Sequence, residues 1–175
     1  MNFKSALLVS VALLLGTHAA WAQTPAFIAP DDPDWKETEV PPPPAFDVGK
    51  LVVFEVSRNS QLVYGVDPAT IQISEKDSLV RYVMVATGAS GARNAMYEGI
   101  RCSTGEFKTY ARASSDGKWN HVKDPQWRSV FDNMPSKHAL RFARAGACDG
   151  AAPAPSVNSL ISRLKDPNFR LTTTD

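Results

Sequence analysis

Short runs of apolar and β-branched residues recur from residue 48 onward and predict a series of strands. The strongest is the run LVRYVMVA at residues 79–86, which is apolar on both faces except at Arg81. Two further runs flank Ser103-Thr104-Gly105, and this three-residue connection predicts a hairpin. Short connections between successive strands favour antiparallel pairing. The predicted strands are residues 51–56, 62–66, 71–73, 79–86, 95–102 and 106–112.

Helical periodicity is clearest near the carboxyl end of the chain, where an amphipathic helix is predicted after the N-cap residue Ser156. Its apolar positions, spaced i, i+3, i+4 and i+7, are Val157, Leu160, Ile161 and Leu164. A second helix is predicted over residues 137–145, with Ser136 as its cap. Residues 118–135 show no period, and we expect an ordered loop held by aromatic side chains. The pattern predicts an α+β domain, a small antiparallel sheet of about five strands with one or two C-terminal helices.

The first 22 residues have the organisation of a secretory signal peptide. Lys4 gives a positive start, residues 6–15 are almost entirely apolar, and residues 20–22 read Ala-Trp-Ala, a cleavage box. The apolar run is about ten residues long and a membrane span needs roughly 20, so a cleaved signal is favoured over an anchor. We predict cleavage between Ala22 and Gln23, a periplasmic or secreted bacterial protein, and no transmembrane segment after cleavage.

Residues 23–47 differ in composition from the rest of the chain and hold 7 of its 13 prolines, with four in succession. Such a run adopts an extended polyproline helix and cannot join a sheet interior, so we predict a mobile, acidic tail and linker. Trp35 within it either packs loosely on the domain or anchors a partner. The predicted organisation is a signal peptide at 1–22, the tail at 23–47, one domain at 48–165 and a C-terminal tail at 166–175.

Charge is balanced overall, with 19 basic and 18 acidic residues, which argues against a nucleic-acid binder. It is unevenly spread, because residues 23–80 carry 10 acidic and 4 basic residues and residues 81–165 carry 6 and 13. We predict an anion-binding face on the helix at residues 137–145, with help from Lys108 or Arg112. Its partner would be an anionic envelope component or an acidic protein segment. The alternative is a solvated face that balances the acidic half. The residues of this face are Lys108, Arg112, Lys137, Arg141 and Arg144.

Cys102 and Cys148 are the two cysteines of the chain, and in an oxidising compartment such a pair most simply forms a disulfide. The bond joins the predicted hairpin to the end of the helix predicted at residues 137–145. Two alternatives are open. A redox pair usually shows Cys-x-x-Cys, which is absent. A zinc site drawn from these cysteines with His121 and His138 lacks the short ligand spacing that zinc sites favour.

The sequence contains no Walker A motif, dinucleotide-binding glycine pattern, His-Glu-x-x-His or Gly-x-Ser-x-Gly. After signal cleavage, the bases open to a serine triad are His121 and His138, and we expect His138 to be solvated on the basic helix. Glu98 and Glu106 could be drawn as a carboxylate pair, but exposed charges on strands are the ordinary case. No catalytic residue, cofactor or metal site is predicted.

Six stretches together resemble the cryptic-neisserial-protein-like (CNP-like) family of secreted bacterial proteins. They are PDDPDW at residues 30–35, DVGK at 47–50, YGVDP at 64–68, YEGIRC at 97–102, DPQWR at 124–128 and CDG at 148–150. The resemblance covers most of residues 30–165. The family is one of unknown function, so the resemblance implies a secreted protein and carries no catalytic residue over to this chain.

A remoter similarity is to the surface-adhesin protein E domain. In that domain a strand leads to a first cysteine on a hairpin, and a tryptophan-containing loop and a helix lead to a second cysteine. Asp67, Cys102, Trp127 and Cys148 occur here in the same order. The function we expect is non-catalytic binding or a structural role in the envelope, and the alternatives are a surface adhesin and an enzyme of unidentified class.

Overall fold

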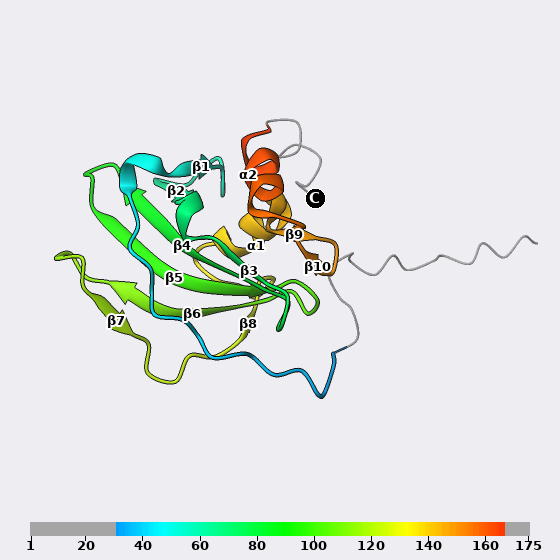
Figure 1. Cartoon of the computed structure of the whole chain (residues 1–175). Coiled ribbons are helices and arrows are strands. Elements are labelled where there is room, and N and C mark those ends of the chain that lie inside the picture. Colours follow the sequence, from blue (N-terminus) through cyan, green and yellow to red (C-terminus); the bar gives the residue numbers. More distant parts are fainter. Residues whose placement is uncertain (1–30, 167–175) are drawn as a thin grey trace, which may run out of the picture.

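The computed structural model describes residues 31–166, and its main sheet has eight antiparallel strands rather than about five (Figure 1). Six strands follow the path β1-β2-β4-β5-β6-β7, while β3 pairs with β4 and β8 pairs with β6. Two short strands, β9 and β10, form a separate hairpin. The strands are β1 Val52–Phe54, β2 Leu62–Val66, β3 Gln72–Ser74, β4 Leu79–Gly88, β5 Arg93–Arg101, β6 Glu106–Ala113, β7 Trp119–His121, β8 Arg128–Ser129, β9 Cys148–Asp149 and β10 Ala152–Pro153.

The predicted number of strands was too low because β7 and β8 lie in the segment without a period. Strands of three and two residues are too short to show alternation, and they are defined by pairing with β6. The strand predicted at residues 62–66 is confirmed. The connection between the strands predicted at residues 79–86 and 95–102 is shorter than expected, because β4 continues to Gly88 and β5 begins at Arg93. The predicted signal peptide at 1–22 and residues 167–175 lie outside the described residues.

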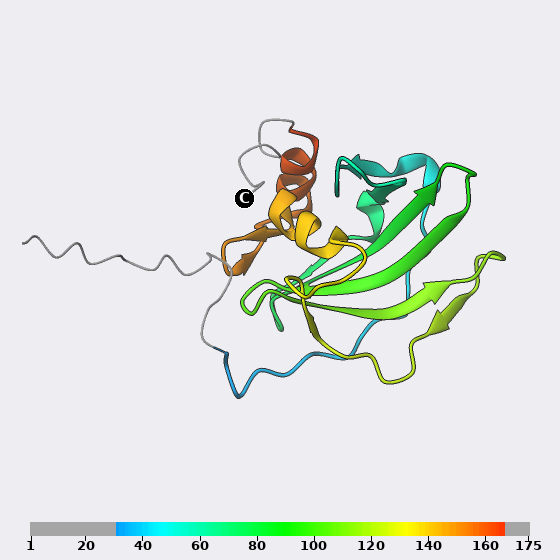
Figure 2. The same cartoon turned by 180° about the vertical axis from the view of Figure 1, so that it is seen from behind.

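Two helices near the carboxyl end cover one face of the sheet (Figures 1 and 2). Helix α1 (His138–Phe142) continues into a π-helical turn, η3 (Ala143–Ala147), and helix α2 spans Val157–Lys165. The predicted cap of α2 is confirmed, since the Ser156 side chain accepts a hydrogen bond from the backbone N–H of Ser159. The core lies between these helices and the sheet.

Two short 3-10 turns lie near the first strands: η1 (Val48–Lys50) precedes β1, and η2 (Pro68–Thr70) lies between β2 and β3. The Asp67 side chain accepts a hydrogen bond from the backbone N–H of Ala69 and so caps η2. It also accepts one from the backbone N–H of Asp47 at 2.7 Å, which fixes the entry of the chain into the domain.

Residues 31–47, called the strap below, cross the opposite face of the sheet instead of extending as a mobile tail (Figures 1 and 2). Trp35 donates from Nε1 to the carbonyl oxygen of Asp77 at 2.9 Å. Its ring lies edge-on to Trp127, and the guanidinium of Arg101 lies 3.9 Å from the ring centroid. Trp35 is therefore packed on its own domain.

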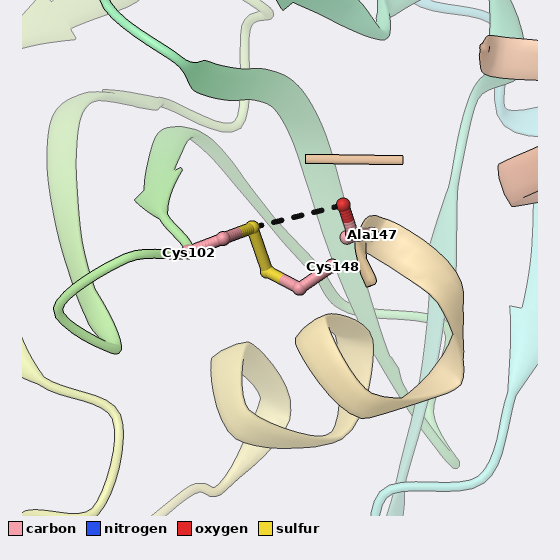
Figure 3. The surroundings of a disulfide bond; sticks show 3 residues. All are labelled: Cys102, Ala147 and Cys148. Carbon is pink, nitrogen blue, oxygen red and sulfur yellow. Dashed lines mark hydrogen bonds between the residues drawn. A yellow bond between two sulfur atoms is a disulfide. The ribbon is translucent and has the colours of Figure 1, made fainter. Parts of the chain in front are cut away.

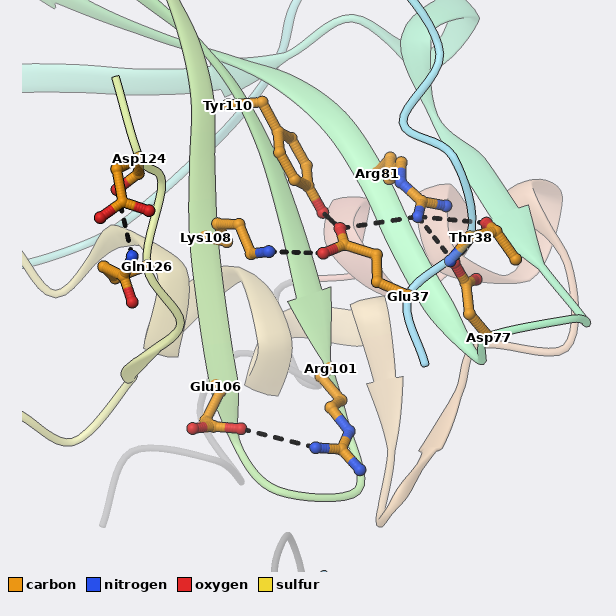
Figure 4. A network of polar contacts seen from close by, with 10 residues as sticks. All are labelled: Glu37, Thr38, Asp77, Arg81, Arg101, Glu106, Lys108, Tyr110, Asp124 and Gln126. Carbon is orange, nitrogen blue, oxygen red and sulfur yellow. Dashed lines mark hydrogen bonds and ion pairs between the residues drawn. The ribbon is translucent and has the colours of Figure 1, made fainter. Parts of the chain in front are cut away.

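Polar anchors in the middle of the strap explain why composition alone misses its docking. The Glu37 carboxylate accepts a hydrogen bond from Tyr110 at 2.6 Å and pairs with Lys108 and Arg81 (Figure 4). Arg81 also pairs with the buried Asp77 at 2.6 Å. Burial alone would raise the pKa of Asp77, but the hydrogen bonds from Arg81 and its neighbours outweigh this and hold that pKa below its ordinary value.

The two-sided covering of β4 explains its unusually apolar sequence. Its first eight residues are buried, because helices lie on one face and the strap lies on the other. Val40 and Phe46 of the strap pack on a second small core that includes Tyr97. Arg81, the one charged residue of the strand, faces the strap and finds its partners there.

The predicted disulfide between Cys102 and Cys148 is confirmed (Figure 3). It joins the end of β5 to the strand that follows η3, and the Sγ of Cys102 lies 3.8 Å from the carbonyl oxygen of Ala147. Both cysteines are joined in this bond, so neither is a free thiol in this structure.

Loss of this bond is expected to destabilise the fold substantially. The cysteines are 46 positions apart, and loop entropy for that separation gives an upper figure of about 4 kcal/mol. Cys148→Ala should lower the midpoint of thermal unfolding about as much as Cys102→Ala/Cys148→Ala, because one bond is lost either way. Calorimetry of the two variants measures this, and an unchanged midpoint in both would contradict it.

Candidate functional site

A cleft of about 590 Å³ opens on the helix-covered side of the sheet, beyond the start of α1. Strands β2, β4, β5 and β6 form its floor. Residues 122–128 form one wall and residues 134–138 form another. The side chains on the floor are spaced two apart along each strand, because alternate residues share one face of a sheet. They include Leu62 and Tyr64 on β2 and Asn94, Met96 and Glu98 on β5.

A β-bulge in β6 changes which side chains reach this cleft. Tyr97 pairs with Ala111 and Glu98 with Thr109, so Tyr110 is an extra residue on β6. Lys108 and Tyr110 face the strap, whereas Thr109 faces the cleft. Beyond the bulge the alternation is inverted, and Arg112 also faces the cleft.

Glu98 lies fully buried at the floor of the cleft and is held by three side-chain donors. Tyr82 donates to its Oε2 at 3.2 Å and Thr109 donates to its Oε1 at 3.0 Å. His138 Nε2 lies 2.9 Å from Oε2. These donors fix the carboxylate in one orientation.

His138 is buried in the cleft wall, so the expectation that it is solvated is wrong. Its ring stacks on Tyr64 and its Nδ1 lies 3.0 Å from the Oγ of Ser136. Burial alone would lower the pKa of His138, but the nearby Glu98 carboxylate outweighs this and raises it above the ordinary value. The contact between His138 and Glu98 at the floor therefore favours the protonated form of His138.

The rim of the cleft is basic and its walls are largely apolar. Arg112 and Arg128 are exposed at the rim, and among the residues that the structure describes Glu98 is the one acidic side chain in the lining. The two arginines outnumber this one carboxyl group, so the described lining of the cleft has an excess of basic groups. The main apolar side chains of the lining are Leu62, Tyr64, Met96, Phe107, Val122 and Met134.

The strap supports the outer wall of the cleft from behind. Within residues 122–128, Pro125, Gln126 and Arg128 line the cleft. Trp127 instead contacts Trp35 of the strap, and Lys108 Nζ lies 4.6 Å from the Trp127 ring centroid. One short segment thus connects the strap to the cleft.

The pair at the floor gives a pH dependence that can be measured. Folding raises the pKa of His138, so its pairing with Glu98 stabilises the protein fully below about pH 6.5, the ordinary pKa of histidine. This stabilisation is lost as the pH rises through the raised pKa. The difference in free energy of unfolding between the wild type and His138→Gln should therefore shrink as the pH rises above about 6.5.

Urea denaturation at each pH gives this difference. His121→Gln is the matched control, because His121 is exposed on β7 and lines none of the described cavities. A difference for His138→Gln that stays constant or grows with pH would show that the pair does not hold the imidazolium.

The structure divides the predicted anion-binding face into separate groups. Lys137, Arg141 and Arg144 come together in a second cavity on α1 and η3. Arg112 lies at the rim of the cleft. Lys108 lies on the other side of the sheet, where it pairs with Glu37. The five residues do not form one continuous surface, because the bulge in β6 places Lys108 and Arg112 on opposite faces.

The sequence analysis treated Glu98 as an ordinary exposed charge on a strand, and this is wrong because Glu98 is buried, although a signal for its burial was present. Met96, Glu98 and Ile100 alternate along one strand, and the neighbours of Glu98 on that face are apolar. An acidic residue at such a position is unusual because burial of an unpaired charge is costly. Glu106, the other carboxylate considered, lies at the far end of the hairpin and accepts from Thr104 at 2.7 Å.

Within residues 31–166 no helix has the length and apolar character needed to cross a bilayer. The same part of the chain contains no group of three or more His, Cys, Asp or Glu side chains arranged to hold a metal ion.

The comparisons with known proteins identify a family. The model of the CNP1-like family matches residues 30–165, a span that includes the strap, the cleft and both cysteines. No curated protein and no solved structure matches the chain. The match extends over well more than half of the sequence, and the chain belongs to the CNP1-like family.

Proposed function

We propose that this protein is an exported, non-catalytic binding protein of the bacterial envelope. Its cleft holds a small molecule with an apolar body and an anionic group. The observation that carries the proposal is the cleft itself, whose apolar walls surround the His138–Glu98 pair and whose rim carries two exposed arginines. Small-molecule sites have this composition, a mainly apolar concavity with a few placed polar groups.

Export is supported by the signal-like first 22 residues and by the disulfide, which persists in oxidising compartments. We expect the mature protein to begin at Gln23. Amino-terminal sequencing of the protein from the envelope fraction tests this, and retention of Met1 there would contradict it.

The proposed ligand orientation follows from charge. An anionic group at the rim is attracted by Arg112 and Arg128, and an apolar body extends toward Met96 and Met134. A cationic ligand is repelled by the same arginines. Dodecanoate is a suitable probe because it combines a carboxylate with an apolar chain, and dodecylamine is the probe of opposite charge.

Calorimetric titration of the purified protein with the two probes tests the proposal. We expect dodecanoate to bind, and Arg112→Gln/Arg128→Gln to weaken it by about tenfold or more. Lys76→Gln/Lys118→Gln is the matched control, because both lysines are exposed and line none of the described cavities. Equal affinity for dodecanoate and dodecylamine, or equal weakening by the two double variants, would contradict the proposal.

A serine esterase is the second candidate, because Ser136, His138 and Glu98 form a hydrogen-bonded series in the cleft. One observation favours binding instead. The raised pKa of His138 favours its protonated form, which cannot take a proton from the hydroxyl. Covalent labelling by a fluorophosphonate that is lost in Ser136→Ala would decide for the esterase.

A further inference from the structure

A second cavity of about 390 Å³ lies beside the cleft and shares Tyr64, Pro135 and Ser136 with it. Its walls are the start of α1, the turn η3 and the loop between β1 and β2. We call it the basic recess and define it by Ser57, Asn59, Ser60, Lys137, Arg141 and Arg144.

The three basic residues of the recess lie on one helical face. Lys137, Arg141 and Arg144 are spaced i, i+4 and i+7, so their side chains project on the same side of α1 and η3. All three are half-buried. Lys137 Nζ is held in place by the backbone carbonyl oxygens of Phe131 and Asp132. The arrangement is therefore partly fixed before any ligand arrives.

The described lining of the recess is basic and includes no acidic side chain. Lys137 and Arg141 are half-buried, which weakens the screening of their charges by water and salt. An anion in the recess would be attracted by both side chains.

We propose that the basic recess binds a phosphate group, carried either by the headgroup of an anionic phospholipid or by free phosphate. The guanidinium of Arg141 can bind two oxygens of a phosphate at once, and Lys137 adds a fixed point charge. Ser57 and Asn59 on the facing loop supply a hydroxyl and an amide group for a further oxygen. This site is separate from the proposed ligand site in the cleft, where the arginines are Arg112 and Arg128.

The test measures binding of the purified protein to inorganic phosphate and to two kinds of vesicle. The vesicles are pure phosphatidylcholine or phosphatidylcholine with phosphatidylglycerol. We expect phosphate or the phosphatidylglycerol vesicles to bind at low salt, and Arg141→Glu/Arg144→Glu to weaken this by about tenfold or more. Lys76→Glu/Lys118→Glu makes the same change in net charge at exposed positions outside the recess and should keep the binding.

The two arms distinguish the source of the phosphate group. Binding to vesicles without binding to inorganic phosphate assigns the recess to a lipid headgroup, and binding to both assigns it to phosphate in general. Equal weakening by the two double variants would overturn the proposal, as would a wild type that binds neither probe at low salt. Where Arg141→Glu/Arg144→Glu does not fold, Arg141→Gln replaces it and must weaken binding severalfold. The dodecanoate titration is not expected to change, which keeps this outcome distinct from that of the cleft.

Discussion

Replacing Glu98 with glutamine is expected to lower the free energy of unfolding by about 3–5 kcal/mol, one of the two largest effects of any single substitution proposed for this protein. Glutamine has nearly the same shape, but it leaves the imidazolium of His138 buried without its counter-charge. Its amide also cannot accept from Tyr82, Thr109 and His138 together, so at least one buried donor loses its partner. Urea denaturation near neutral pH measures the loss.

Glu106→Gln is the matched control for Glu98→Gln, since it makes the same change on the same hairpin. The Glu106 side chain is 32% exposed and lies 3.9 Å from Arg101. Partly exposed ion pairs contribute about 1 kcal/mol or less, so its loss should be small. Equal effects of the two substitutions would show that Glu98 is not a buried partner of His138.

Replacing Arg81 with methionine is expected to destabilise the protein by about 3–5 kcal/mol as well. Its side chain is 3% exposed and that of its partner Asp77 is fully buried, so the substitution leaves a carboxylate buried without a counter-charge. Glu37 loses one of its contacts at the same time, which loosens the strap. Limited proteolysis within residues 31–47 should therefore accelerate in this variant.

A second substitution distinguishes the loss of pairing from a loss of packing. In Arg81→Met/Asp77→Leu the buried carboxylate is removed together with its partner, and much of the lost stability should return. If Arg81→Met/Asp77→Leu is instead less stable than Arg81→Met alone, the loss comes from packing and the ion-pair account is contradicted. Unchanged proteolysis in Arg81→Met would show that the strap is held by other contacts.

Features with local causes could be predicted from the sequence. The strand at residues 62–66, the helix after Ser156 and the disulfide each follow from a periodic pattern, a capping residue or a pair of cysteines. Each of these signals is contained in a few neighbouring residues, or in the chemistry of one residue type. They could therefore be predicted without knowledge of distant contacts, and the structure confirms them.

Features that depend on distant partners could not be predicted in the same way. The strap docks because Glu37 meets Arg81, Lys108 and Tyr110, which are more than forty positions away in the sequence. The residues of the cleft depend on the bulge at Tyr110, which inverts the alternation of β6 and has no sequence signature of its own. Composition correctly describes residues 23–47 as proline-rich, but it contains no information about the anchors that hold residues 31–47.

The strap also gives the family match a structural meaning. The matched span begins at residue 30, next to the first strap residue, and ends at residue 165, the last residue of α2. The strap therefore belongs with the domain and is not a linker to it. Since Trp127 connects the strap to the outer wall of the cleft, we expect the strap to contribute to the shape of the binding site.

The most direct test of the central claim, that the cleft is a ligand site, is NMR spectroscopy of the methionine methyl groups during titration with dodecanoate. Besides Met1, the chain has three methionines, of which Met96 and Met134 line the cleft and Met84 lies in the core. The account predicts that the Met96 and Met134 signals shift and saturate together, that Met84 shifts less, and that the shifts weaken in Arg112→Gln/Arg128→Gln. Binding that saturates while the Met96 and Met134 signals stay in place would contradict it.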